Sequence, residues 1–232
     1  KLIQAGNLPL ETGYVRSSDG GLYIACLTDL GDEVTGEMFE WWFNQVENTE
    51  RYKWWHPYDH IHGTWDQTYF SVQTDLRPRG HYIGHTHIVT EKIGKKVQRL
   101  QIYFMKPDRF VDVSKFEENG VTACVIGRIS VHDPPFGFVA VGYLMHLVRK
   151  TADGKNELRS RFWLGDIHKD EEGFKFLTSR LINTIGNTSF FRNIRLSDNL
   201  ARGLLLHCSQ EMNCLKEFLP HFYQSKINSN AK

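Results

Sequence analysis

The stretch from Ser197 to Tyr223, SDNLARGLLLHCSQEMNCLKEFLPHFY, decides the fold class. Five of its residues recur at helical spacing and share one face: Leu200, Leu204, His207, Glu211 and Leu215. Ser197 is placed to cap the start of this helix. We therefore predict a long C-terminal helix whose largely apolar face packs against another part of the chain.

The middle of the chain supplies that partner as a series of predicted strands. Six stretches are rich in β-branched and aromatic residues: YFSVQTDL (69–76), HYIGHTHIVTEKIG (81–94), RLQIYFM (99–105), TACVIGRISV (122–131), GFVAVGYLMHLVRK (137–150) and ELRSRFWLGD (157–166). Turn signals such as RPRG, ENG, DPPFG and ADG separate them. The pattern predicts an α+β fold, in which a curved antiparallel sheet grips the helix and encloses a ligand cavity.

The N-terminal part joins the same predicted domain. GLYIACLTDL (21–30) is typical of a strand, and TGEMFEWWFNQV (35–46) of a helix that Thr35 caps. We expect one domain overall, with a lead-in and first strand over 1–34, the main domain over 35–225 and a tail over 226–232.

Composition narrows the class of ligand. Lys and Arg number 28 against 27 for Asp and Glu, so charge gives no reason to expect nucleic acid or an anionic membrane. No apolar run approaches the roughly 18 residues of a membrane span. The four cysteines form no CxxC pair, which favours a reducing, cytoplasmic location. We expect a small, mostly uncharged ligand.

The strongest local signal for chemistry is His207 followed by Glu211, because residues four apart on a helix can offer a nitrogen and an oxygen to one ion. The plainer alternative is a His–Glu hydrogen bond on a half-buried face. Three leucines at 204–206 indicate that the pair faces inward, where a carboxylate needs a compensating cation.

Two other stretches offer ligands to the same ion. Alternation in the strand 81–94 places four residues on one face: His85, His87, Val89 and Glu91. A solvated polar face explains that pattern equally well. The stretch ERYKWWHPYDHIHGTWD (50–66) adds three histidines among aromatic rings: His56, His60 and His62. Spacing does not choose among these candidates.

The motifs EWWF, RYKWWHPYDH, THIVTEKIG and the final HxxxE together resemble the 2,4-diacetylphloroglucinol hydrolase family, which includes phloretin hydrolase. The resemblance covers roughly residues 35 to 220. It implies a Bet v 1-like helix-grip fold and a zinc ion held by two histidines and two glutamates. The implied ligands are His60, Glu91, His207 and Glu211. Iron and manganese also suit such a set, so zinc rests on the resemblance.

The resemblance also assigns roles around the metal. It implies that His146 is the acid/base residue and that Tyr52 helps to hold a substrate hydroxyl. Trp55 belongs to the aromatic residues that line the pocket for the substrate. Without the resemblance, His146 is interpreted as a core histidine and Tyr52 as a residue of the pocket wall.

Two departures from the family bear on the substrate. Gly63 stands where family members that cleave diacetylphloroglucinol have an asparagine. Phe162, which we expect to contact the substrate, lies near the position of a second tyrosine. Both changes remove hydrogen-bonding groups, so we expect a different preferred substrate. His56 and His62 remain as residues that orient the ligands. Because the N-terminal part is shorter than in bacterial members, the resemblance leaves a homodimer open.

The implied reaction is hydrolysis of the C–C bond between an acyl group and a polyhydroxylated aromatic ring, which releases a carboxylic acid and a deacylated phenol. The substrate is then a small phenolic or polyketide compound. Two alternatives remain open at the level of sequence. One is a non-catalytic carrier of an apolar molecule, and the other is a metal-dependent decarboxylase or cyclase that acts on a related polyketide.

Overall fold

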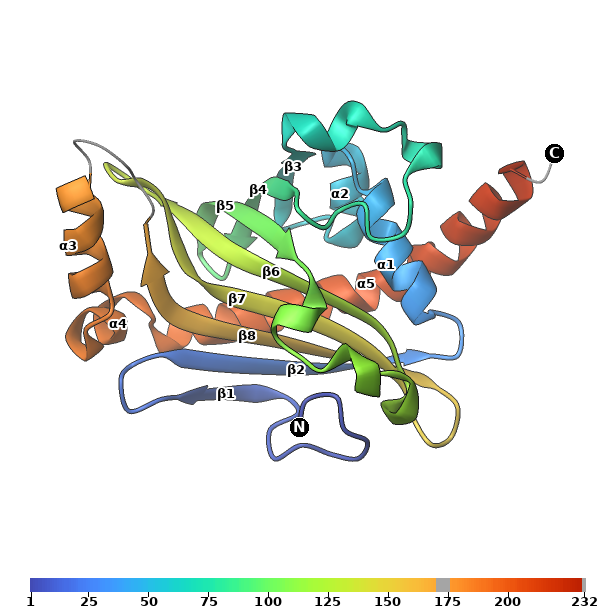
Figure 1. Cartoon of the computed structure of the whole chain (residues 1–232), viewed down its shortest axis with the longest axis horizontal. Helices are drawn as coiled ribbons and strands as arrows, with labels where there is room; N and C mark the ends of the chain where they lie inside the picture. The colour runs from blue at the N-terminus through green and yellow to red at the C-terminus, as the bar shows by residue number, and fades with distance from the viewer. Residues whose placement is uncertain (170–175, 231–232) are drawn as a thin grey trace.

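One antiparallel sheet of eight strands organises the molecule, in the order β1-β2-β8-β7-β6-β5-β4-β3 (Figure 1). The computed structural model describes residues 1–169 and 176–230. The strands are β1 (Gly13–Arg16), β2 (Leu22–Gly31), β3 (His60–Trp65), β4 (Thr86–Ile93), β5 (Lys96–Met105), β6 (Val121–Asp133), β7 (Gly137–Lys150) and β8 (Asn156–His168). The sheet therefore joins the N-terminal strands to the rest of the chain, because β2 pairs with β8.

Several of the helices begin next to a residue whose side chain caps them. They are α1 (Gly36–Gln45), α2 (Thr49–Trp55), α3 (Phe176–Gly186), α4 (Ser189–Arg195) and α5 (Asp198–Asn230). The Thr35 hydroxyl accepts a hydrogen bond from the Met38 amide at 3.2 Å, and the Ser197 hydroxyl accepts one from the Leu200 amide at 3.2 Å. Both predicted caps are therefore confirmed.

Helix α5 lies across the inner face of the curved sheet, with α1 and α2 at one end and α3 and α4 at the other (Figure 1). Its buried residues recur every three or four positions and meet the inward side chains of the sheet. The shared core includes Ile24, Leu144, Val148, Leu158 and Phe162 from the sheet and Ala201, Leu204, Met212, Leu215 and Leu219 from α5. The predicted helix-grip arrangement is confirmed.

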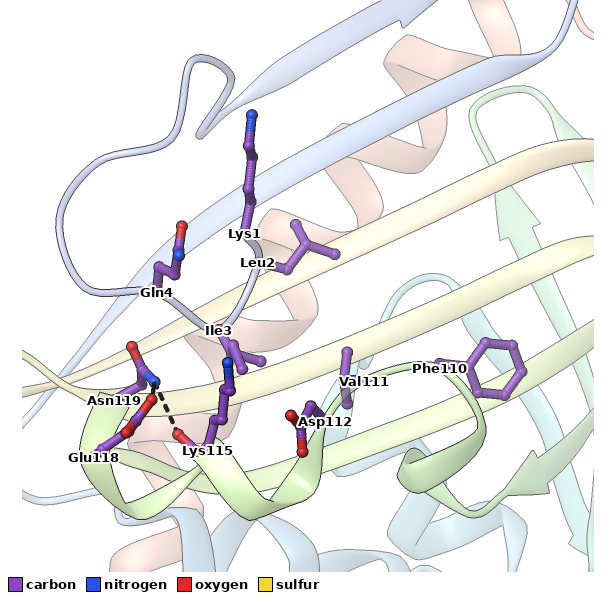
Figure 2. Close-up of a pocket in the computed structure, with 10 residues that line it drawn as sticks. All are labelled: Lys1, Leu2, Ile3, Gln4, Phe110, Val111, Asp112, Lys115, Glu118 and Asn119. Atoms are coloured by element: carbon purple, nitrogen blue, oxygen red, sulfur yellow. Dashed lines mark hydrogen bonds between the residues drawn. The ribbon is translucent and has the colours of Figure 1, made fainter.

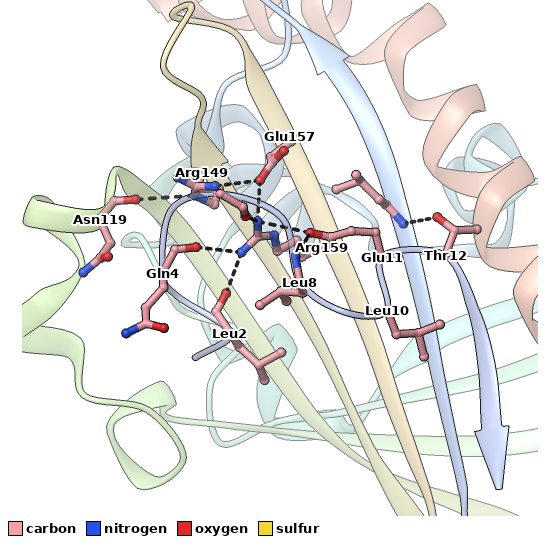
Figure 3. A network of polar contacts seen from close by, with 12 residues as sticks. Leu2, Gln4, Leu8, Leu10, Glu11, Thr12, Asn119, Arg149, Glu157 and Arg159 are labelled. Atoms are coloured by element: carbon pink, nitrogen blue, oxygen red, sulfur yellow. Dashed lines mark hydrogen bonds and ion pairs between the residues drawn. The ribbon is translucent and has the colours of Figure 1, made fainter.

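The opposite face of the central strands is buried as well. A smaller core there consists of Ile3, Val121, Cys124, Ile126, Met145 and Leu147. The N-terminal segment, residues 1–12, runs over this face, where Arg159 of β8 contacts it (Figure 3). The Arg159 guanidinium donates to the carbonyl oxygens of Leu2 at 3.1 Å and Gln4 at 2.9 Å. Arg161 pairs with Glu11 at 2.8 Å.

The strand predicted over residues 69–76 is wrong. This segment forms two short 3₁₀ helices, Gln67–Ser71 and Thr74–Leu76. Asp66 caps the first of them, because its carboxylate accepts a hydrogen bond from the Tyr69 amide at 3.1 Å. The Tyr69 hydroxyl then donates to the Phe43 carbonyl at 2.9 Å, so its ring is used to anchor a turn. Local capping here outweighs β-propensity.

The remaining short 3₁₀ helices lie between β5 and β6, at Pro107–Arg109, Val113–Lys115 and Glu117–Asn119. Among the described residues, no helix is both long enough and apolar enough to cross a membrane.

Candidate metal centre

His60 stands at the start of β3 and presents one free ring nitrogen to the interior. Its Nδ1–H donates to the Tyr52 carbonyl at 2.8 Å, which fixes the tautomer and leaves Nε2 as an acceptor. The Tyr52 ring stacks on the imidazole, with centroids 3.8 Å apart. Nε2 is buried and has no hydrogen-bond partner among the described residues. This nitrogen is oriented in the way that a metal ligand requires.

Glu91 faces His60 because of strand register. Residue 60 of β3 pairs with residue 91 of β4, and the His60 Nε2 to Glu91 Oε1 distance is 4.0 Å. The Tyr52 hydroxyl donates a hydrogen bond to the same carboxylate oxygen. Burial, together with the Glu91 carboxylate beside it, raises the pKa of Tyr52 well above its ordinary value, so the phenol remains a donor.

Helix α5 brings His207 and Glu211 to the same point. The His207 Nε2 to Glu91 Oε2 distance is 3.7 Å, and the Glu211 Oε2 atom lies 3.5 Å from His60 Nε2 and 3.9 Å from His207 Nε2. All four side chains belong to residues that are at most 9% exposed. The structure thus brings together the four predicted ligands, which come from β3, β4 and α5.

These four residues fit a divalent cation. Burial, reinforced by the neighbouring Glu91 carboxylate, raises the pKa of Glu211 to about 8, although His207 opposes the shift. Two buried carboxylates are costly side by side, and a bound cation would remove that cost. One ligand atom each from His60, His207 and Glu211 lies within 4.8 Å of the others. Two imidazoles and two carboxylates suit zinc, iron or manganese.

His146 lies on the inner face of β7, beside Ser160 of β8. Its Nδ1 and the Ser160 hydroxyl are 2.8 Å apart, and the ring meets the edges of Phe39 and Phe162 at centroid distances of 6.1 and 5.9 Å. Burial lowers the pKa of His146 to about 3. Desolvation by the surrounding core favours the uncharged ring in this state.

The aromatic residues form a wall around the centre. Trp55 is buried and meets the His60 ring edge-on at a centroid distance of 6.2 Å. Gly63 lies directly beneath Tyr52, because a Cβ atom at position 63 would stand 2.7 Å from the tyrosine ring. A side chain at this position would displace Tyr52. The absence of a side chain at Gly63 thus allows Tyr52 to take its position beside the centre.

The other predicted histidines separate into two groups. His56 and His87 are buried beside the centre: the His56 ring stacks on His207 with centroids 4.8 Å apart, and the His87 ring meets Tyr52 at 5.1 Å. His62 is exposed and contacts Thr49 at 3.1 Å. His85 precedes β4 instead of sharing its inner face, and pairs with Asp66 at 3.2 Å. These two lie outside the centre.

A surface pocket of about 390 Å³ lies on the opposite side of the sheet, where Lys1–Gln4 meet residues between 110 and 119 (Figure 2). None of its lining residues belongs to the candidate centre. An internal cavity beside the four ligands stays a prediction.

Asp59 is a further neighbour of the centre that the sequence did not indicate. Its carboxylate lies 3.6 Å from His207 Nδ1 and 3.6 Å from His56 Nε2. The signal available in the sequence was its position next to His60, which did not reveal its closeness to the C-terminal helix.

Comparison with known proteins gives a consistent picture. The family model described as "DAPG hydrolase PhiG domain" matches residues 1–224. The chain is 27% identical to 2,4-diacetylphloroglucinol hydrolase of Pseudomonas protegens over 192 residues, which are 82% of this chain and 60% of that protein. It is 26% identical to phloretin hydrolase of Eubacterium ramulus, over 88% of this chain and 68% of that protein. The chain thus spans about 60% of the length of the Pseudomonas relative.

Among solved structures, the Mycobacterium smegmatis protein Ms6760 has a TM-score of 0.42 at 14% identity. The match covers 91% of this chain and 98% of Ms6760. Ginseng major latex-like protein 151 from Panax ginseng has a TM-score of 0.35 at 14% identity. This match covers 76% of this chain and 99% of the ginseng protein.

Proposed function

Because the chain belongs to the DAPG hydrolase PhiG domain family, we propose that it is a metal-dependent hydrolase of phenolic ketones. It cleaves the C–C bond between an acyl group and a polyhydroxylated aromatic ring. The observation that carries this proposal is the convergence of His60, Glu91, His207 and Glu211 next to a buried tyrosine. Retention of all four ligand types argues for catalysis over simple transport.

The proposed metal is zinc, held by the two histidines and the two glutamates. Bound there, it would supply a Lewis acid that polarises the acyl oxygen and activates water. Nε2 of His60 has the free lone pair that such binding needs, and its partner nitrogen is already engaged by the Tyr52 carbonyl. Iron or manganese suits the same donors.

The reaction breaks one C–C bond and uses one water. A C–O bond forms at the acyl carbon, the C–C bond to the ring breaks, and the ring carbon receives a proton. In the keto tautomer of the ring, the departing carbanion is an enolate, which makes it a tolerable leaving group. We assign the proton transfer to His146. In its neutral form the imidazole has a lone pair with which it first accepts a proton, and it then returns a proton to the ring carbon.

Tyr52 and the surrounding aromatic residues orient the ring of the substrate. The Tyr52 hydroxyl already donates to Glu91, so it stands where a substrate hydroxyl would share the same carboxylate. Phe162 and Gly63 add no hydrogen-bonding groups, which favours an acylphenol with fewer polar contacts than diacetylphloroglucinol makes in its own hydrolase. The substrate class we propose is therefore acylphloroglucinols and related polyketides.

The test combines metal analysis with a substrate screen. Purified protein loaded with zinc is offered a panel of acylphloroglucinols, and the released carboxylic acid is measured. We expect about one equivalent of metal and acid release from at least one compound. A protein that binds these phenols but retains less than about a tenth of an equivalent of any transition metal is a carrier, and this would overturn the proposal.

Ligand variants sharpen the same test. His207→Ala and Glu211→Ala should each lose most of the bound metal and activity while remaining folded. Glu91→Gln should lose metal more mildly, because the amide oxygen still coordinates but lacks the charge. Glu217→Gln, on the exposed side of α5, is the matched control and should behave as wild type. Full metal content and turnover in a ligand variant would remove that residue from the centre.

A further inference from the structure

One nitrogen next to the centre remains unexplained. Nε2 of His207 faces the two glutamates, but its Nδ1 is buried and has no hydrogen-bond partner in the part of the chain that the structure describes. A buried imidazole N–H without an acceptor costs on the order of 1–3 kcal/mol. The carboxylate of Asp59 is 3.6 Å away, just beyond hydrogen-bonding distance.

The backbone of Asp59 is fixed on both sides. Its amide donates to His56 Nδ1 at 3.2 Å, and its carbonyl accepts from the Lys92 amide at 2.8 Å. The second bond ties the turn to β4, one residue beyond Glu91. The Asp59 side chain is 20% exposed and extends from this fixed turn toward His207 of α5. A shift of a few tenths of an ångström brings it into hydrogen-bonding range of His207.

His56 determines whether this corner is a second cation site or a hydrogen-bonded relay. His56, Asp59 and His207 have the right residue types for a cation. However, His56 Nδ1 accepts the Asp59 amide proton, so in the neutral ring the proton sits on Nε2. That nitrogen lies 3.6 Å from the Asp59 carboxylate and 3.4 Å from Gln210 Oε1, both of which are acceptors. A protonated nitrogen donates, and does not ligate.

We propose that Asp59 is a positioning residue for the metal centre. It accepts the Nδ1–H of His207, which holds Nε2 of that ring as a lone pair directed at the metal. His56 donates to the same carboxylate from the other side and keeps it in place. This inference rests on the proposed metal centre, but not on the reaction that the centre performs.

Asp59→Ala and Asp59→Asn test the inference on the full chain, with zinc as the probe. Zinc affinity is measured by competition with a chromogenic chelator. Asp59→Ala should bind zinc about 10 to 100 times more weakly, because a lost carboxylate partner of a ligating histidine typically costs this much. Asp59→Asn retains an oxygen acceptor and should lose less. Asp32→Asn, an exposed carboxylate elsewhere, is the control and should bind as wild type does.

A second readout follows the His207 proton directly. In the zinc-loaded wild type, proton NMR should show a downfield Nδ1–H resonance that exchanges slowly with water. Asp59→Ala should shift this resonance upfield and accelerate its exchange, which a general loss of packing at an exposed turn would not do selectively.

The outcomes separate the possibilities. Unchanged zinc affinity and an unchanged resonance in Asp59→Ala would overturn the inference. So would loss of a second equivalent of zinc in that variant, because it would mean that Asp59 is a ligand of another ion. A wild type that takes up no zinc overturns the centre and this inference together. A wild type that binds zinc but cleaves no acylphenol overturns the reaction alone.

Discussion

The surroundings of His146 determine both the charge and the orientation of its ring. Ser160 contacts Nδ1, and burial keeps the ring uncharged. We predict that His146→Asn retains zinc and still binds an acylphloroglucinol, but turns over roughly a hundred to ten thousand times more slowly, because asparagine cannot relay a proton. Zinc content, quenching of tryptophan fluorescence by the ligand and steady-state turnover would be measured on one preparation.

Two results would contradict this role. Slow turnover that merely follows zinc loss would make His146 a structural residue. Normal turnover would transfer the proton relay to another group, such as the buried His87, whose Nε2 is without a hydrogen-bond partner among the described residues.

The same residue has a measurable effect on acid stability. Since the pKa of His146 is about 3 in the folded protein against 6.5 as its ordinary value, its contribution to stability is complete above pH 6.5 and is lost as the pH falls toward 3. Metal-free His146→Asn should therefore lose about 2 kcal/mol less of its free energy of unfolding than wild type between about pH 6.5 and about pH 4.5. Urea unfolding at both pH values gives the comparison, and parallel curves would contradict the prediction.

At the scale of elements, the position of α5 depends on a close approach to the β4–β5 turn. A Cβ atom on Gly203 would stand 2.9 Å from the Gly94 nitrogen, and Gly94 holds a φ of 61° in that turn. Gly203→Ala must push α5 away from the sheet, one turn before His207. We predict a loss of about 1–2 kcal/mol in the free energy of unfolding, after a gain of up to about 1 kcal/mol in helix propensity.

Zinc affinity should fall in Gly203→Ala as well, because α5 carries two of the four proposed ligands. The exposed neighbour Arg202→Ala should change the unfolding free energy by less than about 0.5 kcal/mol. Chemical denaturation and chelator competition on both variants make the comparison. A stabilised Gly203→Ala with normal zinc affinity would show that the contact between turn and helix yields easily.

Some of these elements and contacts could be predicted from the sequence alone, and others could not. The predicted strand 137–150 is β7 from Gly137 to Lys150, because a long β-branched run lies between clear turn signals. The strand prediction for residues 69–76 was wrong because a strand needs a pairing partner, whereas Asp66 caps a 3₁₀ helix locally. Helical spacing placed His207 beside Glu211. Spacing could not show which of His56, His60 and His62 faces that pair. The β3–β4 register decides this, because it sets His60 opposite Glu91.

At the scale of the whole molecule, Arg159 fastens the N-terminal segment to the outer face of the sheet. It donates to backbone carbonyls of that segment and pairs with Glu157 at 3.1 Å (Figure 3). Arg159→Met should destabilise the protein by roughly 3 kcal/mol, because Glu11 and several carbonyls lose a buried charged partner. Amides of residues 1–12 should also exchange hydrogen faster.

Zinc affinity should stay close to that of wild type in Arg159→Met, because the segment covers the face of the sheet opposite to α5. Arg195→Ala removes an exposed pair with Asp133 and should cost no more than about 1 kcal/mol. Hydrogen exchange and denaturation of the two variants test the contrast. Unchanged protection over residues 1–12 would show that the segment is held by its apolar contacts alone.

The division of the four proposed ligands between β3, β4 and α5 has a consequence for the order of events during synthesis. His60 and Glu91 leave the ribosome more than a hundred residues before His207 and Glu211. The growing chain therefore carries half of the proposed binding site through most of translation. Two donors on a sheet edge would hold an ion weakly, and the proposed site would be complete only after the last helix docks. For the metal that we propose, capture would be a late step that follows completion of the sheet.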